Sequence, residues 1–142
     1  MRQAIRQATR TLRVDTAGRG FYEITASIVD FLRSARVNDG LLTVFCRHTS
    51  ASLSITENAD PNVLRDLEAF LARIAPEGAA YLHDDEGPDD MPAHIRAALT
   101  QTQLSIPVLD GAPALGTWQG VFLLEHRRRP HRRDIVLHLM GE

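Results

Sequence analysis

Apolar residues recur along the chain with two different periods, and these periods separate predicted helices from predicted strands. A repeat of three to four positions, which places apolar side chains on one helix face, covers residues 25–36 and 61–75. The second segment is the clearer one, because Asp60-Pro61 is a typical helix start and Pro76 ends the pattern. A third, shorter helix is predicted over residues 92–100.

Apolar runs that alternate with period two, or that are short and continuous, predict strands in the rest of the chain. The segment 119–125 is apolar through its middle, which is typical of a central strand. The segment 52–56 is expected to pair with 41–47. The predicted strands cover residues 5–16, 21–24, 41–47, 52–56, 104–109, 119–125 and 134–140.

The order of these elements predicts the fold class. Strands outnumber helices, and they do not alternate regularly with them as they do in a parallel α/β fold. We therefore expect residues 1–142 to form one α+β domain. Its sheet should be mixed or antiparallel, sandwich-like, with helices packed on it.

Composition narrows the classes of partner. A length of 142 residues is typical of one domain, and 16 basic against 18 acidic side chains give a net charge of -2. That balance argues against a nucleic acid or a membrane surface as the partner. With a single cysteine, Cys46, and no apolar run of signal-peptide or membrane-spanning length, we expect a cytoplasmic protein.

A first group of polar residues surrounds His48, at the end of the predicted strand 41–47. Glu57 and Asp60 follow one short strand later, and a hairpin would return Glu57 toward His48. Two interpretations stay open for His48: a hydrogen-bonded histidine at a strand end, or a member of a catalytic site. Cys46 shares a strand face with His48, and a buried, inert thiol is the favoured interpretation there.

A second group consists of His83 and His94, which bracket an acidic loop. Histidine is a common metal ligand and the usual acid or base near neutral pH. The eleven-residue spacing fits no dedicated zinc motif, and a solvated acidic loop is the favoured interpretation of Asp84, Asp85 and Glu86. We nevertheless predict that His48, His83 and His94 converge in space.

A third group is the basic run 126–133, which holds five arginines in seven residues. The planar guanidinium matches phosphate oxygens in pairs, so this run predicts a phosphorylated ligand. Arg133 should be aimed at the ligand because it adjoins a strand, whereas Arg127 and Arg128 should mostly face water. Trp118 is interpreted as a core residue, or as a residue that stacks on a flat ring.

Taken together, several short motifs resemble the signature of the YjbQ family over residues from about 40 to the C-terminus. The resemblance implies an α+β fold, a homotrimer and a secondary thiamine-phosphate synthase activity. That reaction joins a pyrimidine-methyl diphosphate to a thiazole phosphate and releases diphosphate. The matching residues are His48-Thr49-Ser50-Ala51, Glu57-Asn58, Asp60-Pro61, His94, Ile106-Pro107, the L-G-T-W-Q of 115–119, Glu125 and Arg133.

One departure from the family is Asp90, which stands where many members have asparagine. It adds negative charge near the expected site and favours a cation there, Zn²⁺ or Mg²⁺. The implied reaction needs a cation for the departing diphosphate and basic side chains to hold phosphates. The expected catalytic residues are His48, Glu57 and Asp60; the metal ligands are His48, His83 and His94; the substrate contacts are Arg47, Thr49, Ser50, Trp118, Gln119 and Arg133.

Two rival functions share the same expected pocket. One is a metal-dependent hydrolase of a phosphate ester. The other is a non-catalytic trimer that binds a metabolite. All three hypotheses predict a phosphorylated small molecule as the ligand, and the sequence does not separate them.

Overall fold

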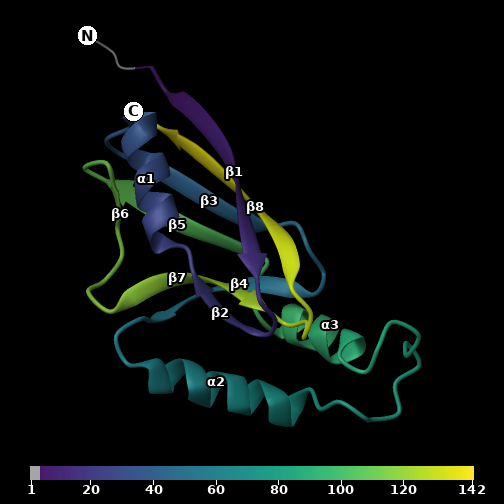
Figure 1. The fold of residues 1–142 in the computed structure, drawn as a ribbon. Coiled ribbons are helices and arrows are strands. Elements are labelled where there is room, and N and C mark those ends of the chain that lie inside the picture. The colour runs from purple at the N-terminus through teal and green to yellow at the C-terminus, as the bar shows by residue number, and fades with distance from the viewer. Residues whose placement is uncertain (1–3) are drawn as a thin grey trace.

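In the computed structural model, which describes residues 4–142, eight strands and three helices build two antiparallel sheets (Figure 1). The predicted α+β class is therefore confirmed. The elements are β1 (Arg6–Thr16), β2 (Gly20–Glu23), α1 (Thr25–Ala35), β3 (Gly40–Cys46), β4 (Ala51–Glu57), α2 (Pro61–Ile74), α3 (Asp90–Leu99), β5 (Gln103–Leu109), β6 (Ala112–Pro113), β7 (Gln119–Glu125) and β8 (His131–Gly141).

Some strands that follow one another in the sequence belong to different sheets. The larger sheet has the order β1-β8-β3-β5-β6 and the smaller one β2-β7-β4. The expected pairing of segment 52–56 with 41–47 is wrong, because β4 pairs with β7 in the other sheet, with Leu53 opposite Leu123. Both edges of β3 are already occupied, by β5 and β8, so the chain crosses between the sheets through residues 47–50.

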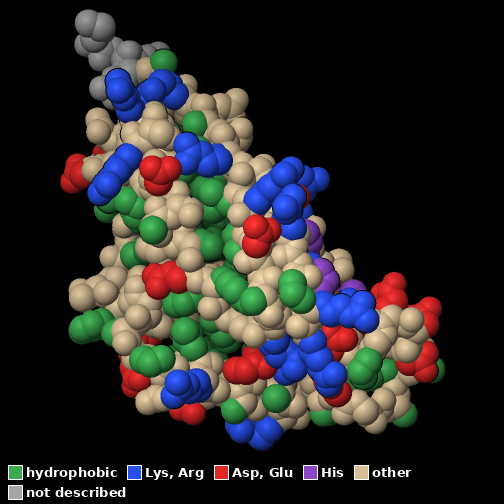
Figure 2. Space-filling model, viewed as in Figure 1, with side chains coloured by type: hydrophobic (Ala, Val, Ile, Leu, Met, Phe, Trp, Pro, Cys, Tyr) green, Lys and Arg blue, Asp and Glu red, His purple; other side chains and the backbone are tan. Residues whose placement is uncertain are grey.

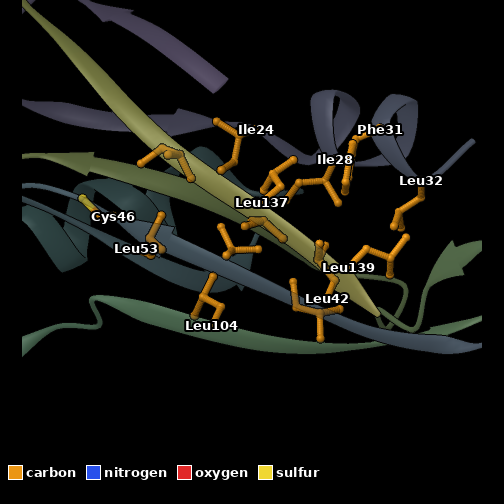
Figure 3. Packing of buried hydrophobic residues seen from close by; sticks show 14 of the residues in the cluster. Ile24, Ile28, Phe31, Leu32, Leu42, Cys46, Leu53, Leu104, Leu137 and Leu139 are labelled. Atoms are coloured by element: carbon orange, nitrogen blue, oxygen red, sulfur yellow. The ribbon is translucent and has the colours of Figure 1, made fainter. Parts of the chain in front are cut away.

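The hydrophobic core lies between the larger sheet and a layer formed by α1 and the smaller sheet (Figure 3). Leu42 of β3 and Leu139 of β8 belong to it from the larger sheet, and Ile28 of α1 and Leu53 of β4 belong to it from the other layer. Each of these side chains is fully buried. Burying one such side chain contributes about 1.5–3 kcal/mol, so this layer supplies the main apolar stabilisation.

Helices α2 and α3 cover the second face of the smaller sheet, at the bottom of Figure 1. The cover is incomplete, because Phe70 and Ile74 of α2 stay exposed and line an apolar groove with Leu99 of α3. No helix within residues 4–142 is long and apolar enough to cross a membrane.

The outer face of the larger sheet also carries exposed apolar side chains. Leu41 and Phe45 of β3 point away from the core, as do Leu109 of β5 and Met140 of β8. Central strands with apolar residues on both faces are typical of sheets that are covered on both sides. Within residues 4–142, the chain itself leaves these four side chains exposed.

Two elements begin earlier in the chain than predicted, and each of them therefore includes a candidate site residue. Helix α3 begins at Asp90 rather than at residue 92, because Pro92 is tolerated in the first turn, where its missing N–H has no partner to lose. Strand β8 begins at His131 rather than at residue 134. Asp90 is therefore a helical residue and Arg133 a strand residue.

Candidate metal centre

Helix α3 holds an aspartate and a histidine one turn apart on one face. Asp90 and His94 are separated by four positions, and this spacing brings side chains together on a helix. Asp90 Oδ2 lies 3.2 Å from His94 Nε2. The Asp90 carboxylate is almost fully buried, with 3% of its side chain exposed, whereas His94 is partly accessible.

The loop between α2 and α3 turns back and adds two more potential ligands. His83 Nε2 lies 2.6 Å from Asp90 Oδ2, and Glu86 Oε2 lies 3.4 Å from the same histidine nitrogen. One ligand atom from each of His83, Glu86, Asp90 and His94 lies within 4.8 Å of the others. Two imidazoles and two carboxylates at this separation form a set that could hold a divalent metal ion.

The charges of the cluster favour a cation. Burial alone would raise the pKa of the Asp90 carboxyl, but the hydrogen bonds from its neighbours, His83 first among them, and the positive charge of Arg127 together outweigh burial, and the pKa is lowered. The same hydrogen bond raises the pKa of His83. His83 thus carries a proton over a wider pH range than a free imidazole. A metal ion would take the place of that proton, since only the deprotonated imidazole binds metal.

Arg127 lies inside this centre, and the expectation that it would face water is wrong. Only 18% of its side chain is exposed. Its guanidinium contacts Asp89 and Asp90 and the carbonyl oxygen of Glu86. Arg128 is 57% exposed and pairs with Glu77, so the neighbouring arginine does face outward. Figure 2 shows basic, acidic and histidine side chains close together at the right of the molecule.

The crossing loop 47–50 lies beside the centre, but His48 is not one of its members. The carbonyl oxygen of Thr49 lies 3.1 Å from His94 Nδ1. His48 Nε2 instead accepts a hydrogen bond from the Asp134 backbone N–H at 2.8 Å, and burial together with the charge of Arg133 lowers its pKa. The predicted convergence therefore holds for His83 and His94 only. For His48, the structure agrees with the hydrogen-bonded histidine at a strand end.

Arg133 takes part in a buried ion pair next to the loop. Its Nε and Nη2 donate to the two oxygens of Glu125 at 2.8 and 2.5 Å, and Nη2 also donates to the Ser50 hydroxyl oxygen at 3.0 Å. Burial would raise the pKa of Glu125, but the hydrogen bonds from Arg133, Thr16 and the Arg127 backbone, together with the charge of Arg133, outweigh burial and the pKa is lowered. These contacts occupy two of the three guanidinium nitrogens, and anion binding by Arg133 stays a prediction.

The other sequence candidates lie at the far end of the smaller sheet. Glu57 pairs with Gln119 at one end of the β4–β7 ladder, whereas Ala51 pairs with Glu125 at the other end. Six residues of strand span about 20 Å, so Glu57 does not return to His48. Trp118 is 62% exposed beside Gln119, which contradicts its interpretation as a core residue.

Glu57 and Asp60 have a local structural role in this position. Asp60 Oδ1 accepts a hydrogen bond from the Asn62 N–H at 2.9 Å and caps α2, and Glu57 accepts one from the Asp60 N–H at 3.2 Å. Arg47 is an exposed residue whose backbone N–H donates to the Asp134 carbonyl oxygen. Sequence reasoning placed the negative charge of Asp90 near a cation but did not name Asp90 or Glu86 as a metal ligand. The signal for Asp90 as a ligand was its four-residue spacing from His94 on an extended α3.

Comparison with known proteins agrees with the motifs. The family model described as "UPF0047 protein YjbQ-like" matches residues 10–142. The UPF0047 protein of Synechocystis is 52% identical over 138 residues, covering 96% of this chain and 94% of its own length. The YjbQ protein of Escherichia coli O157:H7 is 45% identical over 134 residues, with coverage of 94% and 97%.

Solved structures show the same fold. A protein of unknown function from Sulfolobus solfataricus superposes with a TM-score of 0.91 at 20% identity, covering 98% of this chain and 100% of its own. A conserved hypothetical protein from Thermus thermophilus has a TM-score of 0.80 at 34% identity, with coverage of 90% and 97%. At 20% identity, the first likeness concerns the fold alone.

Proposed function

The chain belongs to the YjbQ-like UPF0047 family, and from this premise we propose that it is a metal-dependent enzyme that acts on a phosphorylated small molecule. The observation that carries the proposal is the cluster of His83, Glu86, Asp90 and His94, with ligand atoms within 4.8 Å of one another. The Asp90 carboxylate pairs with Arg127 through Oδ1 and turns Oδ2 toward the two imidazoles, where a metal ion would be held.

The donor set favours zinc over magnesium. Imidazole nitrogen suits zinc and other transition metals, whereas Mg²⁺ prefers oxygen ligands in octahedral geometry. Three or four protein ligands at a partly open site are also typical of catalytic zinc. His83, Asp90 and His94 would hold the ion, with Glu86 as the fourth ligand or as an acceptor at the open side.

The reaction we propose is transfer of a pyrimidine-methyl group from its diphosphate to a thiazole phosphate. The C–O bond to diphosphate breaks with the electron pair on oxygen, and the thiazole nitrogen forms the new C–N bond. A bound divalent ion supplies charge stabilisation for the departing diphosphate. Ser50 and Arg47, on the crossing loop next to His94, are the residues that we propose to orient the phosphates, with Arg133 behind them.

Hydrolysis of a phosphate ester is the second candidate, and one observation favours it. Trp118 and Gln119 lie about 20 Å from the cluster within one chain, since the whole β4–β7 ladder separates them from it. The aromatic residue expected to stack on a ring is therefore not beside the metal ligands of its own chain. Water would then be the acceptor in place of the thiazole nitrogen, at the same centre.

We propose that the chain binds two further copies of itself and forms a homotrimer. Support comes from the exposed apolar residues Leu41, Phe45, Leu109 and Met140 on the outer face of the larger sheet. Another subunit on this face would cover it, as sheets with two apolar faces require.

The test is a reaction with both phosphorylated precursors and either Zn²⁺ or Mg²⁺, followed by chromatography of the products. We expect thiamine phosphate and diphosphate, and no product after chelation. His94→Ala should reduce the rate by more than the roughly 10–100-fold that outer-shell changes cost. The control is Asp66→Ala, an exposed change in the middle of α2, away from both the metal cluster and the outer face of the larger sheet.

The products separate the candidate functions. Diphosphate together with the pyrimidine alcohol would identify hydrolysis. Metal binding without turnover of either substrate would favour the non-catalytic binding protein. Full activity of a thoroughly chelated enzyme would contradict the proposal.

A further inference from the structure

We propose that Arg127 is the positioning residue of the metal centre, which fixes two of its four candidate ligands before an ion arrives. The inference rests on the proposed metal-dependent function and adds a residue to it. Arg127 lies in the turn between β7 and β8, more than thirty positions along the chain from Glu86 and Asp90. Only the tertiary structure brings these three residues together.

The first contact orients the Asp90 carboxylate. Arg127 Nη1 donates to Asp90 Oδ1 at 2.6 Å, so this oxygen is turned away from the ligand cluster. The other oxygen, Oδ2, is the one that faces His83 Nε2 at 2.6 Å and His94 Nε2 at 3.2 Å. Asp90 is thereby prepared to bind a metal through a single oxygen.

The second contact holds the loop that carries Glu86. Arg127 Nη2 donates to the Glu86 carbonyl oxygen at 3.0 Å. The next residue, Gly87, has a φ of +99°, a left-handed conformation that glycine adopts without the strain of a side chain. The turn at Gly87 and the bond from Arg127 together set the direction in which the Glu86 side chain leaves the backbone.

The third contact holds Arg127 itself. Its Nε donates to Asp89 Oδ2 at 3.0 Å, and the backbone N–H of Arg128 donates to the same oxygen at 2.9 Å. The Asp89 side chain is 10% exposed. These charge-assisted bonds are largely shielded from water, and three donors of one planar group fix its orientation.

Positioning and simple electrostatics predict effects of opposite sign. Arg127 is a cation next to a site for a dication, so its charge alone opposes metal binding, and removing it should tighten binding. If Arg127 instead orients the ligands, its removal should weaken binding, since outer-shell partners of metal ligands typically contribute 10–100-fold in affinity. The sign of the change therefore decides between the two.

The experiment is a calorimetric titration of the full chain with ZnCl₂ at fixed neutral pH. Arg127→Ala and Arg127→Lys should each bind Zn²⁺ about 10–100-fold more weakly than the unchanged protein. Lysine keeps the charge but has no fork to reach Asp89, Asp90 and Glu86 at once. The matched control is Arg128→Ala, which removes the same charge one residue away, where the side chain pairs with Glu77. Its affinity should change by less than about twofold.

Co²⁺ gives a second readout that a loss of stability would not reproduce. Its visible absorption depends on coordination geometry, so the spectrum of the Arg127→Lys protein should change and that of Arg128→Ala should not. Circular dichroism in chelator checks that each variant is folded. If Arg127→Ala does not fold, Arg127→Lys alone decides the question.

Three results would overturn the inference: tighter or unchanged Zn²⁺ binding by Arg127→Ala, full recovery by Arg127→Lys, or an equal loss in Arg128→Ala. In each of these cases the unchanged protein still binds Zn²⁺, and the proposed metal-dependent function stands. If the unchanged protein binds neither Zn²⁺ nor Co²⁺, both proposals fail together.

Discussion

At the scale of single residues, the buried polar groups near the centre show how environment sets protonation. His126 is fully buried, and its Nε2 lies 2.8 Å from the Ser52 hydroxyl oxygen. Burial and the nearby positive charge of Arg96 lower its pKa from 6.5 to about 3. His126 is therefore neutral in the folded protein at every physiological pH.

A depressed histidine pKa makes the folding stability depend on pH. In the unfolded chain His126 takes up a proton below about pH 6.5, whereas in the folded chain it does so only near pH 3, so acid favours unfolding. The stability that neutral, buried His126 contributes to the folded state is fully present above pH 6.5 and is lost as the pH falls. One proton changes the free energy of unfolding by about 1.4 kcal/mol per pH unit, or about 2 kcal/mol between pH 6.5 and 5.

The measurement is urea unfolding at several pH values between 7 and 5. The glutamine of His126→Gln can still hydrogen-bond Ser52 but does not titrate. The slope of its free energy of unfolding against pH should therefore be smaller than that of the unchanged protein by the equivalent of about one proton. Ala69→Gln, a change at an exposed and non-titrating position of α2, serves as the control and should keep the original slope. An unchanged slope in His126→Gln would show that His126 is not the group responsible.

At the scale of elements, the start of α2 shows that Glu57 and Asp60, which were expected to be catalytic, stabilise the end of a helix. Asp60 is the N-cap, and Pro61 follows in the first turn. Side-chain capping satisfies backbone N–H groups that a helix start leaves without partners. Glu57, at the end of β4, accepts from the Asp60 N–H and fixes the entry of the chain into the helix.

The capping role predicts a loss of stability without a loss of metal binding. Asp60→Ala should lower the free energy of unfolding by about 1 kcal/mol, because the cap of α2 is removed. Zn²⁺ affinity should stay the same, since Asp60 lies at the far end of the β4–β7 ladder. Asp66→Ala, an exposed change in the middle of α2, should alter stability by less than about 0.5 kcal/mol. Weaker Zn²⁺ binding by Asp60→Ala would contradict the assignment.

At the scale of the whole molecule, the exposed outer face of the larger sheet is the feature that the single chain does not explain. Phe45 lies on β3, the central strand of the larger sheet between β8 and β5, on the face that also carries Leu41 and Met140. Exposed apolar patches of this kind mark protein interaction sites. The proposed homotrimer would bury them.

The trimer predicts that a charge in this face separates the subunits. Multi-angle light scattering at micromolar concentration should give three times the chain mass of 15.8 kDa for the unchanged protein. Phe45→Glu should give a smaller assembly, because burying an unpaired carboxylate is strongly unfavourable. Leu99→Glu, an exposed apolar position on α3, should remain trimeric. A monomer in the unchanged protein would contradict the trimer, and dissociation of Leu99→Glu would move the interface to the α2–α3 groove.

The sequence by itself determined the elements and the identity of the family. Apolar periodicity is a local property, so α1, α2 and the longer strands appear close to their predicted bounds. The same holds for the α2 cap, whose signal is two adjacent residues. His83 and His94 were also found as candidate ligands, because few other residue types bind metal near neutral pH.

Only the tertiary structure decided which of these pieces meet. A strand's pattern shows which of its faces is apolar but not which strand lies beside it, so the pairing of β4 with β7 was missed, and with it the separation of Glu57 from His48 by about 20 Å of strand. The partner of a long side chain depends on where a distant loop lies. From the sequence, Arg127 is therefore predicted to face water, yet in the fold it is enclosed by the acidic loop and holds the Asp90 carboxylate.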